Sequence, residues 1–156
     1  MSAIMYEAGM SSANPSDNVV LTVTAQNELK LTLSDLSRFL RRSVRAKDEL
    51  SKESLFEGVL LTEILLAAGV KFGKELRGKR LADYLLVETE DGYRVVFALP
   101  ELDPTFGDSN ILLADRRDGK PLEGSDGRLR LIIPDEKRYA RWVRQIVSLQ
   151  IRSAKG

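Results

Sequence analysis

Short apolar segments separated by turn residues constrain the fold of this chain more than any other feature. Runs rich in apolar and β-branched residues are typical of β-strands when Gly, Pro, Asp or Asn stand between them. The runs are Val19–Thr24, Ser43–Ala46, Tyr84–Val87, Tyr93–Phe97, Ile111–Ala114, Leu129–Ile133 and Val147–Arg152. A further strand, Ser54–Phe56, is expected to end at Gly58. The sequence therefore predicts one α+β domain of mixed sheets with short flanking helices.

Helices are expected at only a few places. Leu60–Ala68 is the clearest, because apolar residues recur on one face at helical spacing, and Gly69 stands at the position of a C-terminal cap. Ser34 is a suitable N-cap for a short helix that continues to Leu40. A helical neighbourhood around Trp142 is expected to pack this side chain into the core.

Composition limits the class of protein. A chain of 156 residues, 43% hydrophobic and 30% charged, fits a single folded domain. We expect residues 1–17 to form a disordered leader and residues 18–153 to form the domain. The 24 basic and 23 acidic residues leave a net charge of +1, which argues against a nucleic-acid partner. No apolar stretch approaches the roughly 20 residues of a membrane-spanning helix, so direct membrane insertion is not expected.

The chain contains neither Cys nor His. Disulfides, thiolate nucleophiles, iron–sulfur clusters and cysteine-ligated metals are therefore excluded, and so is the usual general base near neutral pH. These absences remove most catalytic and metal-site templates. We predict no catalytic residue and no metal ligand.

Several segments, in order, resemble the molybdopterin-dependent oxidoreductase family with the sulfite-oxidase fold. Phe56–Leu61 leads into Ile64–Val70, as an aromatic residue, Gly-Val-Pro-Leu and an apolar helix ending in Ala-Gly-Val do in that family; Leu60 stands where Pro is usual. The other matching segments are Asp91–Tyr93 before Phe97–Leu99, Ile111–Ala114 before Asp118–Leu122, and Leu129–Pro134 before Ala140–Val143. The resemblance runs from Leu21 to Arg152 and implies a single sulfite-oxidase-like molybdopterin-binding domain.

The resemblance also implies a function. Catalytic branches of the family carry a molybdenum-ligating Cys in the stretch that corresponds to Ser43–Asp48, where this chain has none. Small cysteine-less relatives resemble pterin-sensing proteins that partner membrane-bound signalling enzymes. The expected function is thus non-catalytic binding of a pterin or molybdopterin-like ligand in the periplasm, by an exported chain whose signal peptide is absent from Met1–Asp17. The alternatives are an oxidoreductase subunit that holds molybdopterin, a ligand-free interaction domain, and a cytoplasmic location.

Five residues are candidates for contact with the ligand. The resemblance places Tyr93 after a hairpin turn, Arg45 in the former metal loop, and Arg130 and Arg138 near the cofactor mouth; Asp115 could accept hydrogen bonds from a pterin edge. Each has an ordinary alternative: a cross-strand aromatic for Tyr93, solvated charges for the arginines, and a charged turn for Asp115. Arg45, Tyr93, Arg130 and Arg138 are expected to converge on one cleft outside the core.

Overall fold

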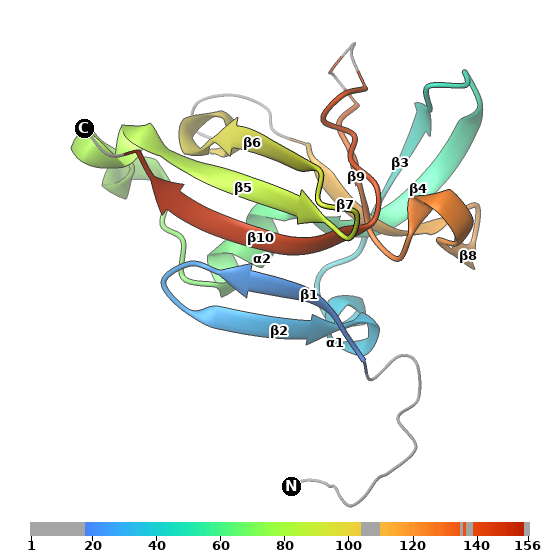
Figure 1. Ribbon diagram of the computed structural model, residues 1–156, viewed down its shortest axis with the longest axis horizontal. Coiled ribbons are helices and arrows are strands. Elements are labelled where there is room, and N and C mark those ends of the chain that lie inside the picture. Colours follow the sequence, from blue (N-terminus) through green and yellow to red (C-terminus); the bar gives the residue numbers. More distant parts are fainter. Residues whose placement is uncertain (1–17, 104–109, 135, 137–138, 155–156) are drawn as a thin grey trace, which may run out of the picture.

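Two sheets built from segments far apart in the sequence form the framework of the molecule (Figure 1). The computed structural model describes residues 18–103, 110–134, 136 and 139–154. The first sheet has the strand order β2 (Glu28–Thr32), β1 (Val19–Thr24), β10 (Ile146–Ser153), β5 (Asp83–Thr89) and β6 (Arg94–Ala98). The neighbours β1 and β10 run parallel, whereas the other pairs are antiparallel. The sheet is therefore mixed.

The second sheet is built from two separate stretches of the chain, residues 42–60 and 112–132. Its order is β3 (Arg42–Lys47), β4 (Glu53–Leu60), β7 (Leu112–Arg117) and β8 (Lys120–Pro121), and β9 (Arg130–Ile132) also pairs with β7. All of these pairs are antiparallel.

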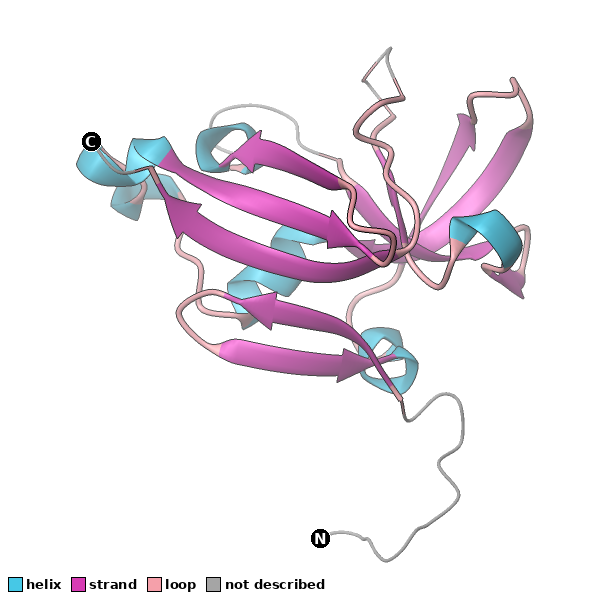
Figure 2. Ribbon diagram, viewed as in Figure 1, coloured by secondary structure: helices cyan, strands magenta, loops and turns pink. Residues whose placement is uncertain are grey.

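The helices are short and lie beside the sheets (Figure 2). They are α1 (Leu33–Ser37) and α2 (Leu61–Ala67), together with the 3-10 turns η2 (Gly73–Glu75), η3 (Gly78–Ala82), η4 (Leu99–Leu102) and η5 (Gly124–Asp126). Ala68 is the C-cap of α2, and Gly69 follows it with a φ of 89° and an N–H that donates to the carbonyl of Leu66, so the helix ends at the glycine as predicted. The predicted α+β class with mixed sheets and short flanking helices is confirmed.

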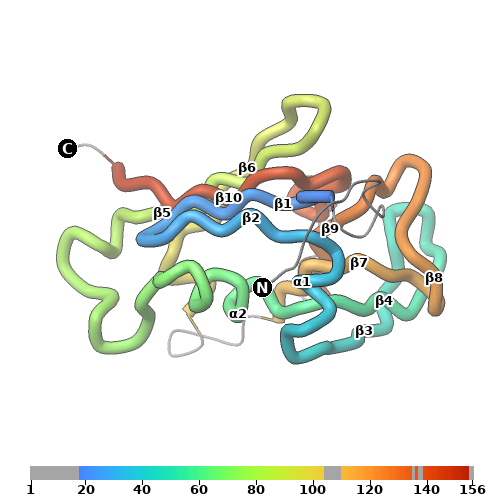
Figure 3. The backbone as a smooth tube through the Cα atoms, turned by 90° about the horizontal axis from the view of Figure 1, so that it is seen from below, coloured from blue at the N-terminus to red at the C-terminus, as the bar shows by residue number. Residues whose placement is uncertain are grey.

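The core lies between the first sheet and a layer made of α2 and the second sheet (Figure 3). The alternation expected for a half-buried strand is clear in β1, where Leu21 and Val23 are fully buried and Thr24 is exposed. Buried side chains from the two layers include Leu21, Val23, Leu85, Val87 and Leu149 on one side, and Phe56, Leu61, Ile64, Leu65 and Leu113 on the other.

Two predicted helices differ from the structure. The first begins at Leu33 rather than after Ser34, because Thr32 is the N-cap: its hydroxyl accepts from Asp35 N–H at 3.0 Å, and the Asp35 carboxylate accepts from Thr32 N–H at 3.0 Å. The segment around Trp142 is a series of turns, not a helix. Trp142 is nevertheless buried, as expected.

Contrary to the prediction, Gly58 does not end the segment that begins at Ser54 but lies inside β4. A Cβ atom at this position would stand 2.0 Å from the carbonyl oxygen of Leu113 and 2.7 Å from Cα of Ala114. The pairing of β4 with β7 shifts register between Glu57 and Gly58. Glycine is therefore required by the close approach of two backbones, which sequence patterns alone interpret as a strand end.

We predict that Gly58→Ala lowers the free energy of unfolding by about 4 kcal/mol or more, because the new methyl group meets backbone atoms that cannot rotate away. Gly92→Ala is the matched control. Gly92 has a φ of 88° and open space around it, so only backbone strain of about 1–2 kcal/mol is expected. Urea denaturation followed by circular dichroism measures both, and equal losses would contradict the assigned role of Gly58.

Candidate ligand-binding cleft

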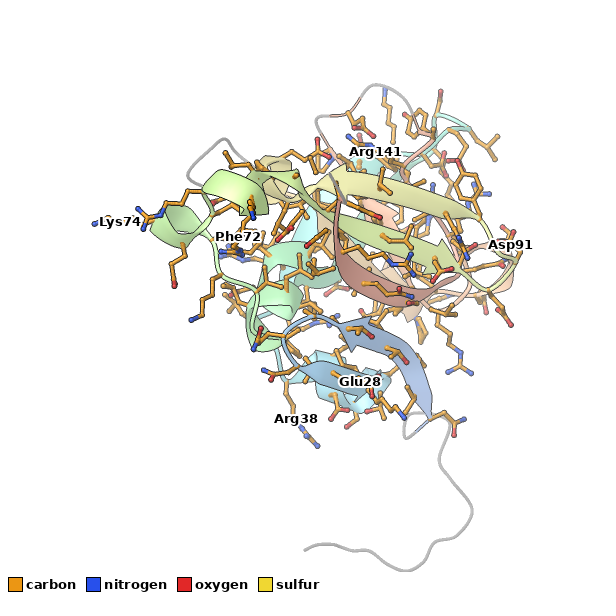
Figure 4. All side chains as sticks on the ribbon, turned by 60° about the vertical axis from the view of Figure 1, so that its left-hand side comes forward. Glu28, Arg38, Phe72, Lys74, Asp91 and Arg141 are labelled. Atoms are coloured by element: carbon orange, nitrogen blue, oxygen red, sulfur yellow. The ribbon has the colours of Figure 1, made fainter. Side chains whose placement is uncertain are left out.

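A cleft of about 450 Å³ lies where the β5–β6 turn meets the segment 139–145. The turn contributes Asp91 and Tyr93, and the segment contributes Tyr139, Trp142 and Arg144 among others. Figure 4 shows Asp91 at one end of the molecule and Lys74 at the opposite end. The cleft is thus built at the hairpin end of the first sheet.

Aromatic side chains form one part of the cleft and connect its elements. The rings of Tyr139 and Trp142 meet edge to face, with centroids 4.7 Å apart and an interplanar angle of 71°. The Tyr93 hydroxyl donates to the carbonyl of Ala140 at 3.3 Å, and the Tyr139 hydroxyl donates to the carbonyl of Lys47 at 3.1 Å. The last bond places the end of β3 beside the cleft.

Backbone contacts fix the irregular segment that carries these rings. Gln145 lines the cleft and has a φ of 58°, which is uncommon for a residue with a side chain. Its N–H donates to the carbonyl of Asp126 and its carbonyl accepts from Glu90 N–H, both at 2.9 Å. Gly127 packs so closely that a Cβ there would lie 2.7 Å from Cα of Gln145. The position of the segment is therefore determined by bonds to two other parts of the chain.

Behind the cleft lies Arg130, whose side chain is fully buried. One guanidinium nitrogen donates to Glu49 Oε2 at 2.8 Å, and another donates to Asp126 Oδ1 at 3.2 Å. The guanidinium carbon is 6.0 Å from the ring centroid of Phe56 and 5.9 Å from that of Trp142. Burial lowers the pKa of Arg130 from its ordinary value, and the charge of Asp126 opposes that change. Two carboxylates and two aromatic rings thus accommodate a cation inside the core.

The ion pairs continue from Asp126 to a second arginine. Arg117 donates to Asp126 Oδ2 at 3.2 Å and also to Asp48 Oδ2. Asp48 Oδ1 accepts backbone N–H groups of Leu50 and Lys52, each at 2.9 Å. Burial alone would raise the pKa of Asp48, but these backbone bonds and Arg117 lower it below the ordinary value. Asp48 therefore anchors the turn that carries Glu49.

Two buried donors of the described residues have no hydrogen-bond partner: Arg130 Nε and Trp142 Nε1. Trp142 is only 5% exposed, packs against Tyr139 and lines the cleft. Buried N–H groups without a partner are rare and call for an explanation. An acceptor on a bound molecule would satisfy the Trp142 donor.

The structure brings some of the candidate residues together and separates others. Tyr93 lines the cleft, and Arg130 lies behind it through Glu49. Arg45 lies on β3 with a side chain that is 63% exposed, and it pairs with Glu53 of β4 at 4.0 Å. It does not line the cleft. Asp115 is held in a bidentate pair by Arg41, at 2.6 and 2.9 Å, which raises the pKa of Arg41.

The remaining statements about the candidate residues concern the positions of Arg138 and Arg130. Arg138 lies outside the described residues. Arg130 was expected outside the core, on a solvated strand face or in an open pocket, and this is wrong: all three residues of β9 are buried, so the strand has no solvated face. The convergence of four residues on one cleft is therefore not what the described part of the chain shows.

Apart from Tyr93, the residues that line the cleft were not predicted as site residues from the sequence, and Glu49, Tyr139 and Arg144 are among them. Tyr139 and Arg144 flank Trp142, so the recurrence of aromatic and basic residues in that segment was an available signal. Glu49 had no such signal, because its partners Arg130 and Arg144 stand 81 and 95 residues later.

Comparison with known proteins places the fold. The arrangement of sheets and helices is the sulfite-oxidase-like molybdopterin-domain fold that the sequence predicted. A matching solved structure is the sulfane dehydrogenase SoxCD from Paracoccus pantotrophus, with a TM-score of 0.66 and 20% identity over 92% of the present chain. The present chain covers 40% of that SoxCD chain. No family model and no curated protein matches the sequence.

Two features are absent from the described residues. No helix among them has the length and apolar character needed to span a bilayer. Within the same residues, no group of three or more Asp and Glu side chains is arranged to hold a metal ion.

Removing the buried arginine should destabilise the protein. We predict that Arg130→Ala lowers the free energy of unfolding by about 3–5 kcal/mol, because Glu49 and Asp126 then lose the fully buried cation that both contact. Arg45→Ala, which removes an exposed pair, should cost less than about 1 kcal/mol. Chemical denaturation of both variants measures the difference, and similar stabilities would show that the buried network contributes little.

Asp48 should make stability depend on acid pH. Because its pKa is lowered in the folded protein, its carboxylate stabilises the fold at neutral pH, and that contribution disappears as the pH falls below about 4. We expect Asp48→Asn to lose about 2 kcal/mol at pH 7 and to approach the wild type in acid. Urea denaturation between pH 7 and pH 3 tests this; a constant difference across that range would contradict it.

Proposed function

We propose that the protein binds a pterin-type ligand in the cleft without a protein-ligated metal. The observation that carries the proposal is the buried Nε1 donor of Trp142, which has no hydrogen-bond partner among the described residues and belongs to a side chain that lines the cleft. A pterin presents a flat ring for aromatic contact and an edge of alternating donors and acceptors. An acceptor on that edge would receive the hydrogen bond that Trp142 Nε1–H donates.

Other side chains of the cleft suit the same ligand. Asp91 accepts hydrogen bonds from the hydroxyl of Thr89 and the N–H of Tyr93, which lower its pKa, and its carboxylate can also accept from an amino-pyrimidine edge. Gln145 offers an amide that both donates and accepts. The exposed ring of Tyr93 stands beside these groups. The donor set therefore fits a pterin.

The same residues do not fit a molybdenum ion held by the protein. The chain has no Cys, and the end of β3 beside the cleft is Ala46-Lys47. A soft metal bound by dithiolene sulfur has no thiolate here to complete its coordination. We therefore propose binding and sensing rather than redox catalysis.

An oxidoreductase subunit is the second candidate, and the likeness to the sulfane dehydrogenase SoxCD favours it. In that case the domain would hold a molybdopterin whose metal takes its ligands elsewhere. Protein purified from a host that makes the cofactor would then contain stoichiometric molybdenum. A pterin released without molybdenum supports the sensing proposal, and a preparation with neither supports a ligand-free interaction domain.

Binding can be measured directly by calorimetric titration with a tetrahydropterin. We expect Tyr93→Ala and Trp142→Phe each to weaken binding by about 1–3 kcal/mol, through loss of a ring contact and of the Nε1 donor respectively. Arg45→Ala is the control and should bind as the wild type does, because Arg45 does not line the cleft. Unchanged affinity in both cleft variants would overturn the proposed site.

A further inference from the structure

Glu49 lies between the cleft and a network of ion pairs that also contains Arg117, Arg130, Arg144, Asp48 and Asp126. Its side chain is 31% exposed and lines the cleft. One carboxylate oxygen accepts from Arg130 at 2.8 Å, and the other accepts from Arg144. Each oxygen is thus used by a different guanidinium group, which is the contact pattern that a bound anion would make.

The charges of the network identify which acidic group can be exchanged. Arg117, Arg130 and Arg144 face Asp48, Asp126 and Glu49, so three positive groups meet three negative ones. Asp48 and Asp126 are nearly buried and bonded to Arg117, whereas Glu49 is the acidic member that lines the cleft. Its departure would leave one unpaired positive charge next to the ligand.

The turn that carries Glu49 can keep its backbone while the side chain moves. Asp48 Oδ1 accepts from Leu50 N–H and Lys52 N–H, and Asp48 N–H donates to the carbonyl of Lys52 at 3.0 Å. Ser51 N–H donates to the carbonyl of Asp48 at 2.9 Å. Because these bonds involve Asp48 and not the Glu49 side chain, rotation about side-chain torsions suffices to move the Glu49 carboxylate.

We propose that Arg130 and Arg144 form an anion subsite of the cleft, that Glu49 fills it in the free protein, and that a carboxylate or phosphate group of the ligand replaces Glu49. This inference rests on the proposed function for the pterin ring of the ligand. The anionic group of the ligand is inferred separately, from the contacts of Glu49. Glu49 is then a specificity-determining residue: it sets the affinity difference between ligands with and without an anionic group.

The test compares pterin with pterin-6-carboxylate, which differ in one anionic group, and includes inorganic phosphate as a free anion. Glu49→Gln keeps an acceptor for Arg130 and removes the competing charge. We expect the preference for the carboxylate over pterin, measured as the ratio of their dissociation constants, to rise about tenfold in this variant. Arg144→Gln should abolish the preference. Glu53→Gln, which changes an exposed carboxylate paired with Arg45, should leave it as in the wild type.

Phosphate separates failure of this inference from failure of the proposed function. If neither pterin binds any variant, but phosphate raises the melting temperature of Glu49→Gln more than that of the wild type and Glu53→Gln, the anion subsite stands and the ring assignment fails. If pterin binds while Glu49→Gln, still folded by circular dichroism, changes neither the carboxylate preference nor the phosphate response, the subsite is overturned. Glu49→Ala repeats the comparison should Glu49→Gln fail to fold.

Discussion

The buried guanidinium of Arg130 connects the core to the cleft, and much of the architecture around it follows from its charge. A cation inside a protein requires carboxylates and hydrogen bonds, because an isolated buried charge is costly. Asp126 comes from the η5 turn and Glu49 from the turn between β3 and β4, so both loops are drawn to β9. The guanidinium carbon also lies over the rings of Phe56 and Trp142, at 6.0 and 5.9 Å from their centroids. The loops that border the cleft are therefore fixed partly by the charge of one strand residue.

The cleft itself depends on irregular backbone held by regular sheets. The segment 139–145 has no helix or strand, yet Val143 and Gln145 exchange backbone hydrogen bonds with Leu131, Asp126 and Glu90. Such anchoring supplies a stable position for Tyr139, Trp142 and Arg144 without regular structure. Binding residues commonly occupy segments of this kind, because the adjoining sheets provide rigidity and the segment provides side chains at varied angles.

Local patterns explain what could be predicted from the sequence. The strands and α2 were predictable, because period-two and helical spacings are local and Gly69 marks an end. Tyr93 was predicted from the family resemblance rather than from a local pattern, and its side chain lines the cleft. Arg130 was misplaced because an arginine among apolar residues resembles an alternating strand, and only the distant partners Glu49 and Asp126 make its burial favourable. Gly58 was misinterpreted for a similar reason, since its neighbour Leu113 belongs to another strand. Contacts between distant segments leave little trace in a single sequence.

The position of β10 has a consequence for how the chain acquires its structure. This strand lies between β1 and β5, and it alone joins the β1–β2 hairpin to the β5–β6 hairpin within the first sheet (Figure 1). A ribosome delivers β10 after all the other strands, so the two hairpins stay unlinked during most of synthesis. Their sheet can close only by contacts of long sequence separation, which slow folding. Until then the unpaired edges of β1 and β5 are exposed to other chains, and the last strand also serves as protection against aggregation.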